Sequence, residues 1–410
     1  ANTTGHSLTA VGKGALGANT TANHCAAFGL DALASNNAAS NNAFGSGALT
    51  ANTTGGSLCA FGNNALMSNT TASYNSAFGR DALKLNTTGN HNSAVGYAAL
   101  TTNTTGHNNT TVGHEALTAN TTGSKNTAVG AQALDANTTG QYNVAVGYDS
   151  LGANISGNRN TVVGYSAARL NTGTYNTAIG YAALYDHTSG EYNTAIGAAA
   201  LGNNTTASNN TAVGHGALSE NTTGTRNVAV GAYSLDASTT ASDNTALGYQ
   251  ALTATTTGFS NTGIGKDALA VNTTGSSNVA LGNFALDANT TGTGNTALGR
   301  GSLTASTTAS WNTAVGYQAL KSNTTGAENT AIGAWALDAN TTGNYNHAFG
   351  NNALGANTTG SSNVAIGINS LLVNTTGEQN TAIGGFALDA NTTADNNTGI
   401  GYAALTSNTT

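Results

Sequence analysis

Apolar and polar residues recur along this chain in one short pattern from end to end. The consensus is Asn-Thr-Thr-Gly-x-x-Asn-Thr-Ala-Val-Gly-x-x-Ala-Leu-x-Ala, and residues 120–136 and 272–288 are clear copies. From Asn2 to Ser407 there are 24 copies, 22 of 17 residues and two of 16. A short fixed period is typical of repeat proteins in which each unit is one module stacked on the next.

Large apolar residues occupy two positions of each copy, counting the first Asn of the consensus as position 1. Position 10 is always Val, Ile, Leu or Phe, and position 15 is Leu in 23 copies, with Ala168 as the exception. Position 11 is Gly in all 24 copies, whereas positions 9 and 14 are nearly always small. This pattern predicts that positions 10 and 15 fill the interior and that the Gly turns the chain. The small residues would form a face that a second chain can approach.

The Asn-Thr-Ala-Val segment predicts a short strand, with positions 8 and 10 on one face and position 9 on the other. The Ala-Leu segment predicts a second short strand, and the Gly, Asn and β-branched residues disfavour helix. We therefore predict an all-β fold, a parallel β-solenoid or β-roll with one repeat per coil and about 24 coils. Residues 1–410 would form a single repeat array. Because neither end carries a polar cap, we expect it to be a segment of a longer fibre protein.

Asn also stands at position 7 in 21 copies, and Leu8, Cys25 and Leu58 replace it in the others. Stacked Asn side chains can bond amide to amide along a fibre, whereas a turn Asn can instead bond its own backbone. Both 16-residue copies, 36–51 and 171–186, lack one residue between positions 1 and 6. Because surface turns tolerate deletions, this predicts that Asn-Thr-Thr-Gly is an exposed loop.

The Asn-Thr-Ala-Val-Gly unit with its Ala-rich partner segment resembles the β-roll head repeats of trimeric autotransporter adhesins. It is also similar to repeat regions of phage tail-fibre-like and bacterial surface proteins. The resemblance extends over every copy, although this unit is longer than the usual head repeat. It implies a left-handed β-roll that trimerises, a role in adhesion or fibre building, and no catalytic residues.

Composition narrows the function classes. Charged residues make up 7% of the chain, against about 25% in ordinary domains. The net charge is −7 and the basic residues form no stripe along the sequence, so nucleic acid is not an expected partner. The sequence contains no run of 18 apolar residues, so it predicts no membrane span. The His and Asp residues form no metal motif and no catalytic arrangement. We therefore predict a protein that is not an enzyme and that needs no cofactor or metal.

Cys25 and Cys59 are too few for a disulfide framework. They would lie two coils apart on opposite faces, which disfavours a bond within the chain. Two alternatives remain for these cysteines: free thiols, or a disulfide bond between chains.

Asn-Thr-Thr is also an N-glycosylation acceptor pattern, although Asn and Thr are equally good turn formers. The Thr hydroxyls could carry O-glycans instead. The candidate acceptors, including the Asn-Ile-Ser variant at Asn154, are Asn2, Asn19, Asn52, Asn69, Asn86, Asn103, Asn120, Asn137, Asn154, Asn204, Asn221, Asn272, Asn289, Asn323, Asn340, Asn357, Asn374 and Asn391.

Aromatic residues are the candidates for surface binding. Position 13 carries Tyr233, Phe284, Trp335 and Phe386 at intervals of three coils, and Trp311 stands at position 6. This spacing is explained either by duplication of a three-coil block or by a stripe of aromatic rings that stack on sugars.

Together these features predict an extracellular structural filament or surface fibre. It would be a homo-oligomer, with a trimer favoured, and its loops are candidates to carry covalent glycans. The alternative is an adhesin or tail-fibre shaft that binds a specific glycan or host surface. A remote alternative, suggested by the Thr arrays, is an ice-binding solenoid.

Overall fold

The computed structural model describes residues 2–409, which form 24 parallel strands and no helix. The predicted all-β parallel solenoid, with one repeat per coil, is therefore confirmed. The chain divides into two compact units, with the boundary between Thr206 and Ala207, and each unit contains twelve strands.

The strands of the first unit are β1 (Leu8–Val11), β2 (Cys25–Phe28), β3 (Asn42–Phe44), β4 (Cys59–Phe61), β5 (Ser76–Phe78), β6 (Ser93–Val95), β7 (Thr110–Val112), β8 (Thr127–Val129), β9 (Val144–Val146), β10 (Thr161–Val163), β11 (Thr177–Ile179) and β12 (Thr194–Ile196). Those of the second are β13 (Thr211–Val213), β14 (Val228–Val230), β15 (Thr245–Leu247), β16 (Thr262–Ile264), β17 (Val279–Leu281), β18 (Thr296–Leu298), β19 (Thr313–Val315), β20 (Thr330–Ile332), β21 (His347–Phe349), β22 (Val364–Ile366), β23 (Thr381–Ile383) and β24 (Thr398–Ile400).

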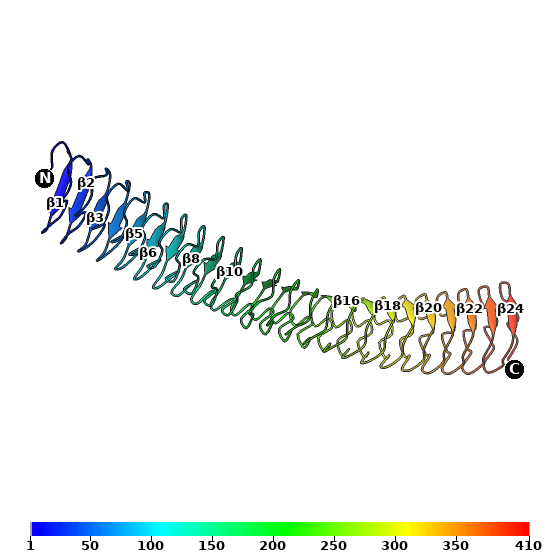
Figure 1. Ribbon diagram of the computed structural model, residues 1–410. Coiled ribbons are helices and arrows are strands. Elements are labelled where there is room, and N and C mark those ends of the chain that lie inside the picture. The colour runs from blue at the N-terminus through cyan, green and yellow to red at the C-terminus, as the bar shows by residue number, and fades with distance from the viewer. Residues whose placement is uncertain (1, 410) are drawn as a thin grey trace. The chain divides into compact units, whose positions relative to one another are not determined.

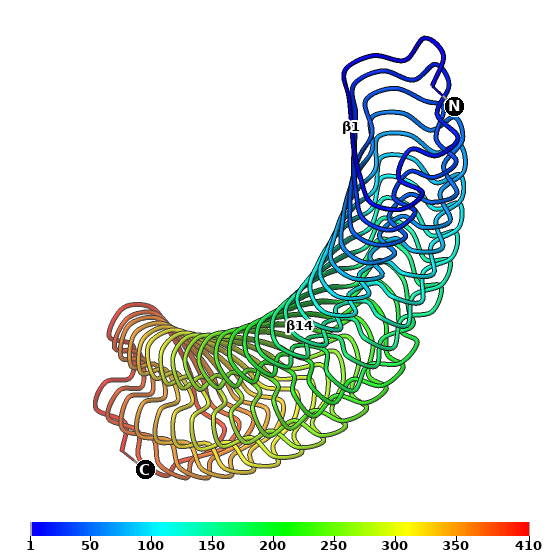
Figure 2. The same ribbon diagram turned by 90° about the vertical axis from the view of Figure 1, so that its left-hand side faces the viewer.

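Within each unit, every strand pairs with the strand of the next coil in the same register. In β8 and β9, for example, Ala128 lies opposite Ala145 and Val129 lies opposite Val146. Figure 1 shows the arrows following one another along one side of each unit, and Figure 2 shows the coils as successive loops. Equivalent side chains of neighbouring coils therefore form ladders.

The strand turns its small residue inward and its large residue outward. Ala128 at position 9 is fully buried, together with Ala133 and Leu134 at positions 14 and 15. Position 10 points to solvent, as Val95 shows with 42% of its surface exposed. The prediction that position 10 fills the interior is therefore wrong. The prediction that the small residues form a face for a second chain is also wrong, because these residues are buried. The coil is so thin that the only large apolar side chain in its interior is the Leu at position 15, beside the Ala residues of positions 9 and 14 and buried Asn side chains.

The Ala-Leu segment forms turns instead of the predicted second strand. Gly at position 11 has φ between 125° and 148°, and a Cβ on Gly130 would collide with the backbone of Gly147 in the next coil. The residue at position 15 has φ between 47° and 56° in every copy. Left-handed backbone is unfavourable for a residue with a side chain, but here it lets Ala133 and Leu134 both face inward. The Leu134 N–H then donates to the Ser150 carbonyl of the next coil at 2.9 Å.

Asn at position 7 forms the predicted ladder, although its bonds run largely to the backbone. The Oδ1 of Asn109 accepts the backbone N–H of Asn126 one coil later at 3.0 Å. Its Nδ2 donates to the Gly123 carbonyl at 3.0 Å. The residue is fully buried, so its amide satisfies backbone groups that water cannot reach.

A second ladder, which the sequence did not reveal, lies at position 1. The Nδ2 of Asn120 donates to the Oδ1 of Asn103 in the preceding coil at 2.8 Å and to the Gly123 carbonyl at 2.9 Å. These Asn side chains are buried, which corrects the prediction of an exposed loop for this position. The Thr at position 3 remains exposed, as in Thr122, while the hydroxyl of Thr121 at position 2 donates to the Thr138 carbonyl at 3.1 Å.

Four coils carry another residue at position 1: His187 in the first unit, and Ser238, Thr255 and Ser306 in the second. The hydroxyls of Ser238 and Ser306 are buried without a hydrogen-bond partner, and so is the Oδ1 of Asn289, one coil before Ser306. These short side chains do not reach the preceding coil, and the ladder is interrupted there.

We predict that Ser306→Asn repairs this gap. The introduced amide would donate to the Oδ1 of Asn289 and to the Ala309 carbonyl, as Asn69 does to the Ala72 carbonyl at 3.0 Å. Because a buried acceptor gains a donor, we expect the opening free energy of these coils to rise by about 1 kcal/mol. Native-state hydrogen exchange measures it, with Ser306→Ala as the control. A fall in protection would contradict a stabilising ladder.

His187 takes the place of Asn in the ladder, and its burial favours the neutral form of the ring. Its Nε2 lies 2.8 Å from the Gly190 carbonyl, and the Nδ2 of Asn204 lies 3.0 Å from its Nδ1. With the proton assigned to Nε2, the ring donates to the carbonyl and accepts from the amide. Burial lowers the pKa of His187 below its ordinary value of 6.5.

This arrangement predicts acid sensitivity of the coils around His187. Because the folded pKa lies below the unfolded value, the neutral ring is compatible with full stability above pH 6.5, and stability is lost as the pH falls from there toward the folded pKa. We expect hydrogen-exchange protection of residues 171–203 to fall between about pH 7.5 and pH 5, relative to His187→Asn. Equal protection of the two proteins at both pH values would refute it.

Candidate functional site

Within each unit, the outer face of the strands presents an unbroken row of large apolar side chains. We call the position-10 residues the apolar stripe. They are Val11, Phe28, Phe44, Phe61, Phe78, Val95, Val112, Val129, Val146, Val163, Ile179 and Ile196 in the first unit, and Val213, Val230, Leu247, Ile264, Leu281, Leu298, Val315, Ile332, Phe349, Ile366, Ile383 and Ile400 in the second. Single exposed apolar residues are ordinary, but a contiguous apolar surface marks an interaction site.

The apolar stripe lies on an uncharged face. Position 8, which shares this face, and position 10 hold no Asp, Glu, Lys or Arg in any copy. Four Phe rings stack in succession near the N-terminus, with centroids of Phe44 and Phe61 4.4 Å apart. Cys59 also stands at position 8, half-exposed with a free thiol, whereas Cys25 is a free thiol buried in the coil.

The candidate glycosylation residues do not lie on the surface. Apart from Asn2 in the first coil, which is exposed, all of these Asn side chains are buried. The Asn120 Nδ2, the atom that would carry the glycan, already donates two hydrogen bonds. The expected accessibility is therefore wrong for the folded chain, because the amide is needed inside the coil. Modification itself stays a prediction, and the exposed hydroxyls are those of the Thr at position 3.

The candidate aromatic residues of position 13 all lie in the second unit, and their binding of sugars stays a prediction. Tyr233, Phe284, Trp335 and Phe386 remain three coils apart, and each packs against a neighbouring coil. The Nε1 of Trp335 donates to the Oε1 of Gln318 at 3.2 Å. Trp311 is 65% exposed and covers the backbone of Gly294. These rings are separate surface features.

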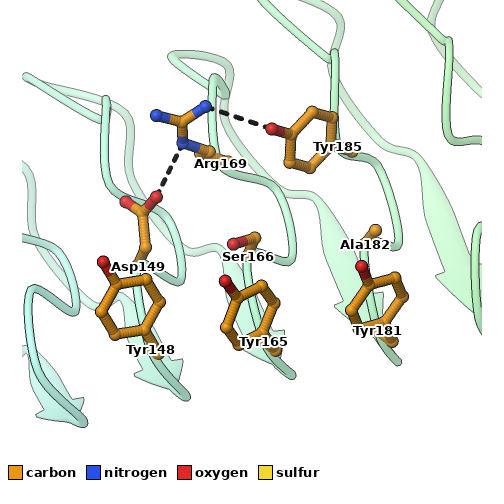
Figure 3. Close-up of a pocket in the computed structure, with 8 residues that line it drawn as sticks. All are labelled: Tyr148, Asp149, Tyr165, Ser166, Arg169, Tyr181, Ala182 and Tyr185. Carbon is orange, nitrogen blue, oxygen red and sulfur yellow. Dashed lines mark hydrogen bonds and ion pairs between the residues drawn. The ribbon is translucent and has the colours of Figure 1, made fainter.

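Tyrosine side chains gather instead around one groove in the first unit, between residues 148 and 185. Tyr148, Tyr165 and Tyr181 stand at position 12 of three successive coils, with ring centroids 5.3 and 5.6 Å apart. They are 46%, 53% and 64% exposed. We call this surface the tyrosine groove; its volume is about 520 Å³, and Figure 3 shows its residues.

The opposite wall of the tyrosine groove is polar. Arg169 donates from Nε to the Oδ2 of Asp149 at 2.7 Å and from Nη1 to the hydroxyl of Tyr185 at 3.1 Å. Both bonds raise the pKa of Arg169, the one to Tyr185 most strongly. Figure 3 shows this row facing the three phenol hydroxyls, with Ser166 and Ala182 between the two rows. The groove exists because those two position-13 side chains are small.

A second cluster lies at position 6 of nearby coils. Lys125 donates to the Tyr142 hydroxyl at 2.9 Å, which is the main cause of a lowered Tyr142 pKa. The Arg159 guanidinium lies 5.5 Å from the Tyr142 ring and 5.2 Å from the Tyr175 ring. The rings of Tyr175 and Tyr192 then stack at 5.0 Å. In this column, the cations and rings of successive coils interact with one another.

The sequence contains a pattern that indicates the tyrosine groove, but the search for aromatic residues at position 13 missed it. Three successive copies read Gly-Tyr at positions 11 and 12, and the next residues are Asp149, Ser166 and Ala182. Recognising the groove required knowing that positions 12, 13 and 16 lie on one surface, which the turn geometry decides.

No protein-family model matches the chain, and no curated protein matches it either. Among residues 2–409, no helix is long and apolar enough to cross a membrane. Within the same range, no group of three or more His, Cys, Asp or Glu side chains is placed to hold a metal ion.

Proposed function

We propose that this protein is an extracellular structural filament whose β-solenoid associates side by side with further copies of itself through the apolar stripe. The observation that carries the proposal is the continuity of this uncharged apolar stripe along the strands within each unit. Burying exposed Val, Ile, Leu and Phe side chains is the main driving force of association.

The regular spacing of the apolar stripe favours a second copy as the partner. Each coil adds one position-10 side chain at the strand spacing, about 4.8 Å. A surface that matches this row over many coils needs the same axial period, and another copy of the chain has it. Parallel copies would also bring the Phe residues of β2–β5 onto equivalent Phe residues. The proposed assembly is a parallel homo-oligomer, with a trimer favoured by the resemblance to adhesin head repeats.

The surface composition supports a mechanical role outside the cell. The rungs are tied by backbone and Asn hydrogen bonds, and charged residues are only 7% of the chain. Exposed Thr at position 3 would face outward from the assembly and could carry O-glycans. The proposed function requires no catalysis, because a filament of this kind resists extension and presents a repeated surface.

We predict that Val95→Glu with Ile332→Glu weakens self-association. Both side chains lie on the apolar stripe, and an unpaired charge buried in an interface costs several kcal/mol. The matched control is Thr88→Glu with Thr325→Glu, which places the same charges on exposed position-3 residues of the same two coils. Analytical ultracentrifugation should show dissociation only for the stripe variant. A monomeric wild type, or equal association of all three proteins, would refute the proposal.

A parallel assembly also predicts selective cross-linking through Cys59. Its thiol lies on the strand face beside the apolar stripe, so equivalent residues of adjacent copies would come together. We expect mild oxidation to yield a covalent dimer on a non-reducing gel. Cys59→Ser should abolish it, and Cys25→Ser should leave it unchanged because Cys25 is buried. An associated protein that never cross-links would exclude the parallel register.

A further inference from the structure

We propose that the tyrosine groove binds an uncharged, extended oligosaccharide that lies parallel to the axis of the coils. The residues that line this groove do not belong to the apolar stripe, and the inference does not rest on the proposed self-association. It rests on three features of the groove: its two facing rows of hydrogen-bonding groups, the small side chains of Ser166 and Ala182 between these rows, and the regular spacing of the tyrosine rings.

The groove has the size and the mixed lining of a small-molecule site. Its volume of about 520 Å³ lies within the usual range for ligand pockets, about 300–1,000 Å³. The tyrosine rings stack too closely for a sugar to insert between them. A ligand would therefore lie across the ring edges and phenol hydroxyls, where tyrosine offers both apolar contact and hydrogen bonds.

The opposite wall supplies donors and acceptors for sugar hydroxyls. A guanidinium carries five N–H groups, and Arg169 uses Nε–H and one Nη1–H for Asp149 and Tyr185. Its remaining N–H groups can donate to ligand oxygens. Asp149, whose side chain is 21% exposed, can accept from ligand hydroxyls with oxygen capacity not used by Arg169. Because Arg169 and Asp149 hold each other in place, these groups are oriented before a ligand arrives.

The local charge favours a neutral ligand over an anion. Asp149 neutralises Arg169 directly at 2.7 Å. A shallower hollow of about 220 Å³ continues past this pair and is also lined by Asp135. Burial, and then the charge of Asp149, raise the pKa of Asp135. The charged residues that line the groove are thus one paired carboxylate and guanidinium, with no unpaired positive charge to attract an acidic sugar.

The axial spacing explains why the ligand would be an extended chain. Successive tyrosine rings lie 5.3 and 5.6 Å apart, which is close to the length of one pyranose unit in a straight β-linked glycan. One sugar per coil could then meet one phenol hydroxyl. A helical α-linked glycan has a different repeat and would lose register after the first unit.

Position 13 offers a way to fill the floor of the groove without disturbing the fold. Gln occupies this position in other coils as Gln132, Gln250 and Gln318, with φ of 57°, 54° and 55°. Ala182 has φ of 51°, so Ala182→Gln should be accommodated by the backbone. The same change at Ala98, with φ of 53° in another coil of this unit, is the matched control.

The test is isothermal titration of the full chain with cellohexaose, using maltohexaose and a chondroitin sulfate hexasaccharide for comparison. We expect cellohexaose to bind, and Ala182→Gln and Tyr165→Ala each to lower the association constant by at least about tenfold, equivalent to about 1.4 kcal/mol. Ala98→Gln should bind as the wild type does. Thermal unfolding of each variant establishes that the coils remain intact.

Four results would overturn the proposal. The first is no heat of binding with cellohexaose at millimolar concentration, and the second is unchanged binding in a folded Ala182→Gln variant. The third is equal or tighter binding of the sulfated hexasaccharide, which would exclude a neutral ligand. Equal binding of maltohexaose would exclude the match between coil spacing and an extended chain.

Discussion

The hydrogen bonding of buried Asn side chains between coils is the interaction on which this structure depends. A coil of 17 residues encloses so little volume that its turns place backbone amides and carbonyls out of reach of water. An Asn amide has both donors and an acceptor, so it can serve one coil and connect to the next. The position-1 and position-7 ladders meet at one carbonyl: Gly123 accepts from both Asn109 and Asn120. A carboxylate could not replace either residue, because it has no N–H to donate.

The same thin interior explains which apolar residues are exposed. Once Ala128, Ala133 and Leu134 are enclosed, no space remains for Val129. The left-handed conformation at position 15 is unfavourable by itself, yet it is kept in all copies because it turns Leu inward and joins the coil to its neighbour. The large residues at position 10 therefore contact one another along the outer face, as the stacked Phe rings do, and do not fill the interior. The proposed self-association would account for their retention as Val, Ile, Leu or Phe in every copy.

Much of the fold could be predicted from the sequence because the repeat itself carries the information. The period gave one coil per copy, and the alternation around Thr-Ala-Val correctly separated position 9 from position 10. Which of the two faces points inward could not be decided in the same way, because one strand of three residues is compatible with either choice. That choice depends on the turn at positions 13–15, where residues with side chains adopt left-handed backbone that their types do not reveal. For the same reason, the burial of Asn120 and the assembly of the tyrosine groove escaped the sequence pattern.

The division between constant and varied positions relates the proposed filament to the proposed ligand site. Positions 1, 7, 9, 11, 14 and 15 are restricted because each contacts its equivalent in the next coil or fills the interior. Positions 12, 13 and 16 face solvent, so their side chains can change without breaking a ladder. The tyrosine groove arises where Tyr165, Ser166, Arg169 and their neighbours coincide on successive coils. The 16-residue copy 171–186 contributes Tyr181 and Tyr185 to it, although this copy lacks one loop residue. A deletion in the loop leaves the register of positions 7–17 intact, so a repeat of this kind can build a local binding surface while the strands and the apolar stripe continue unchanged.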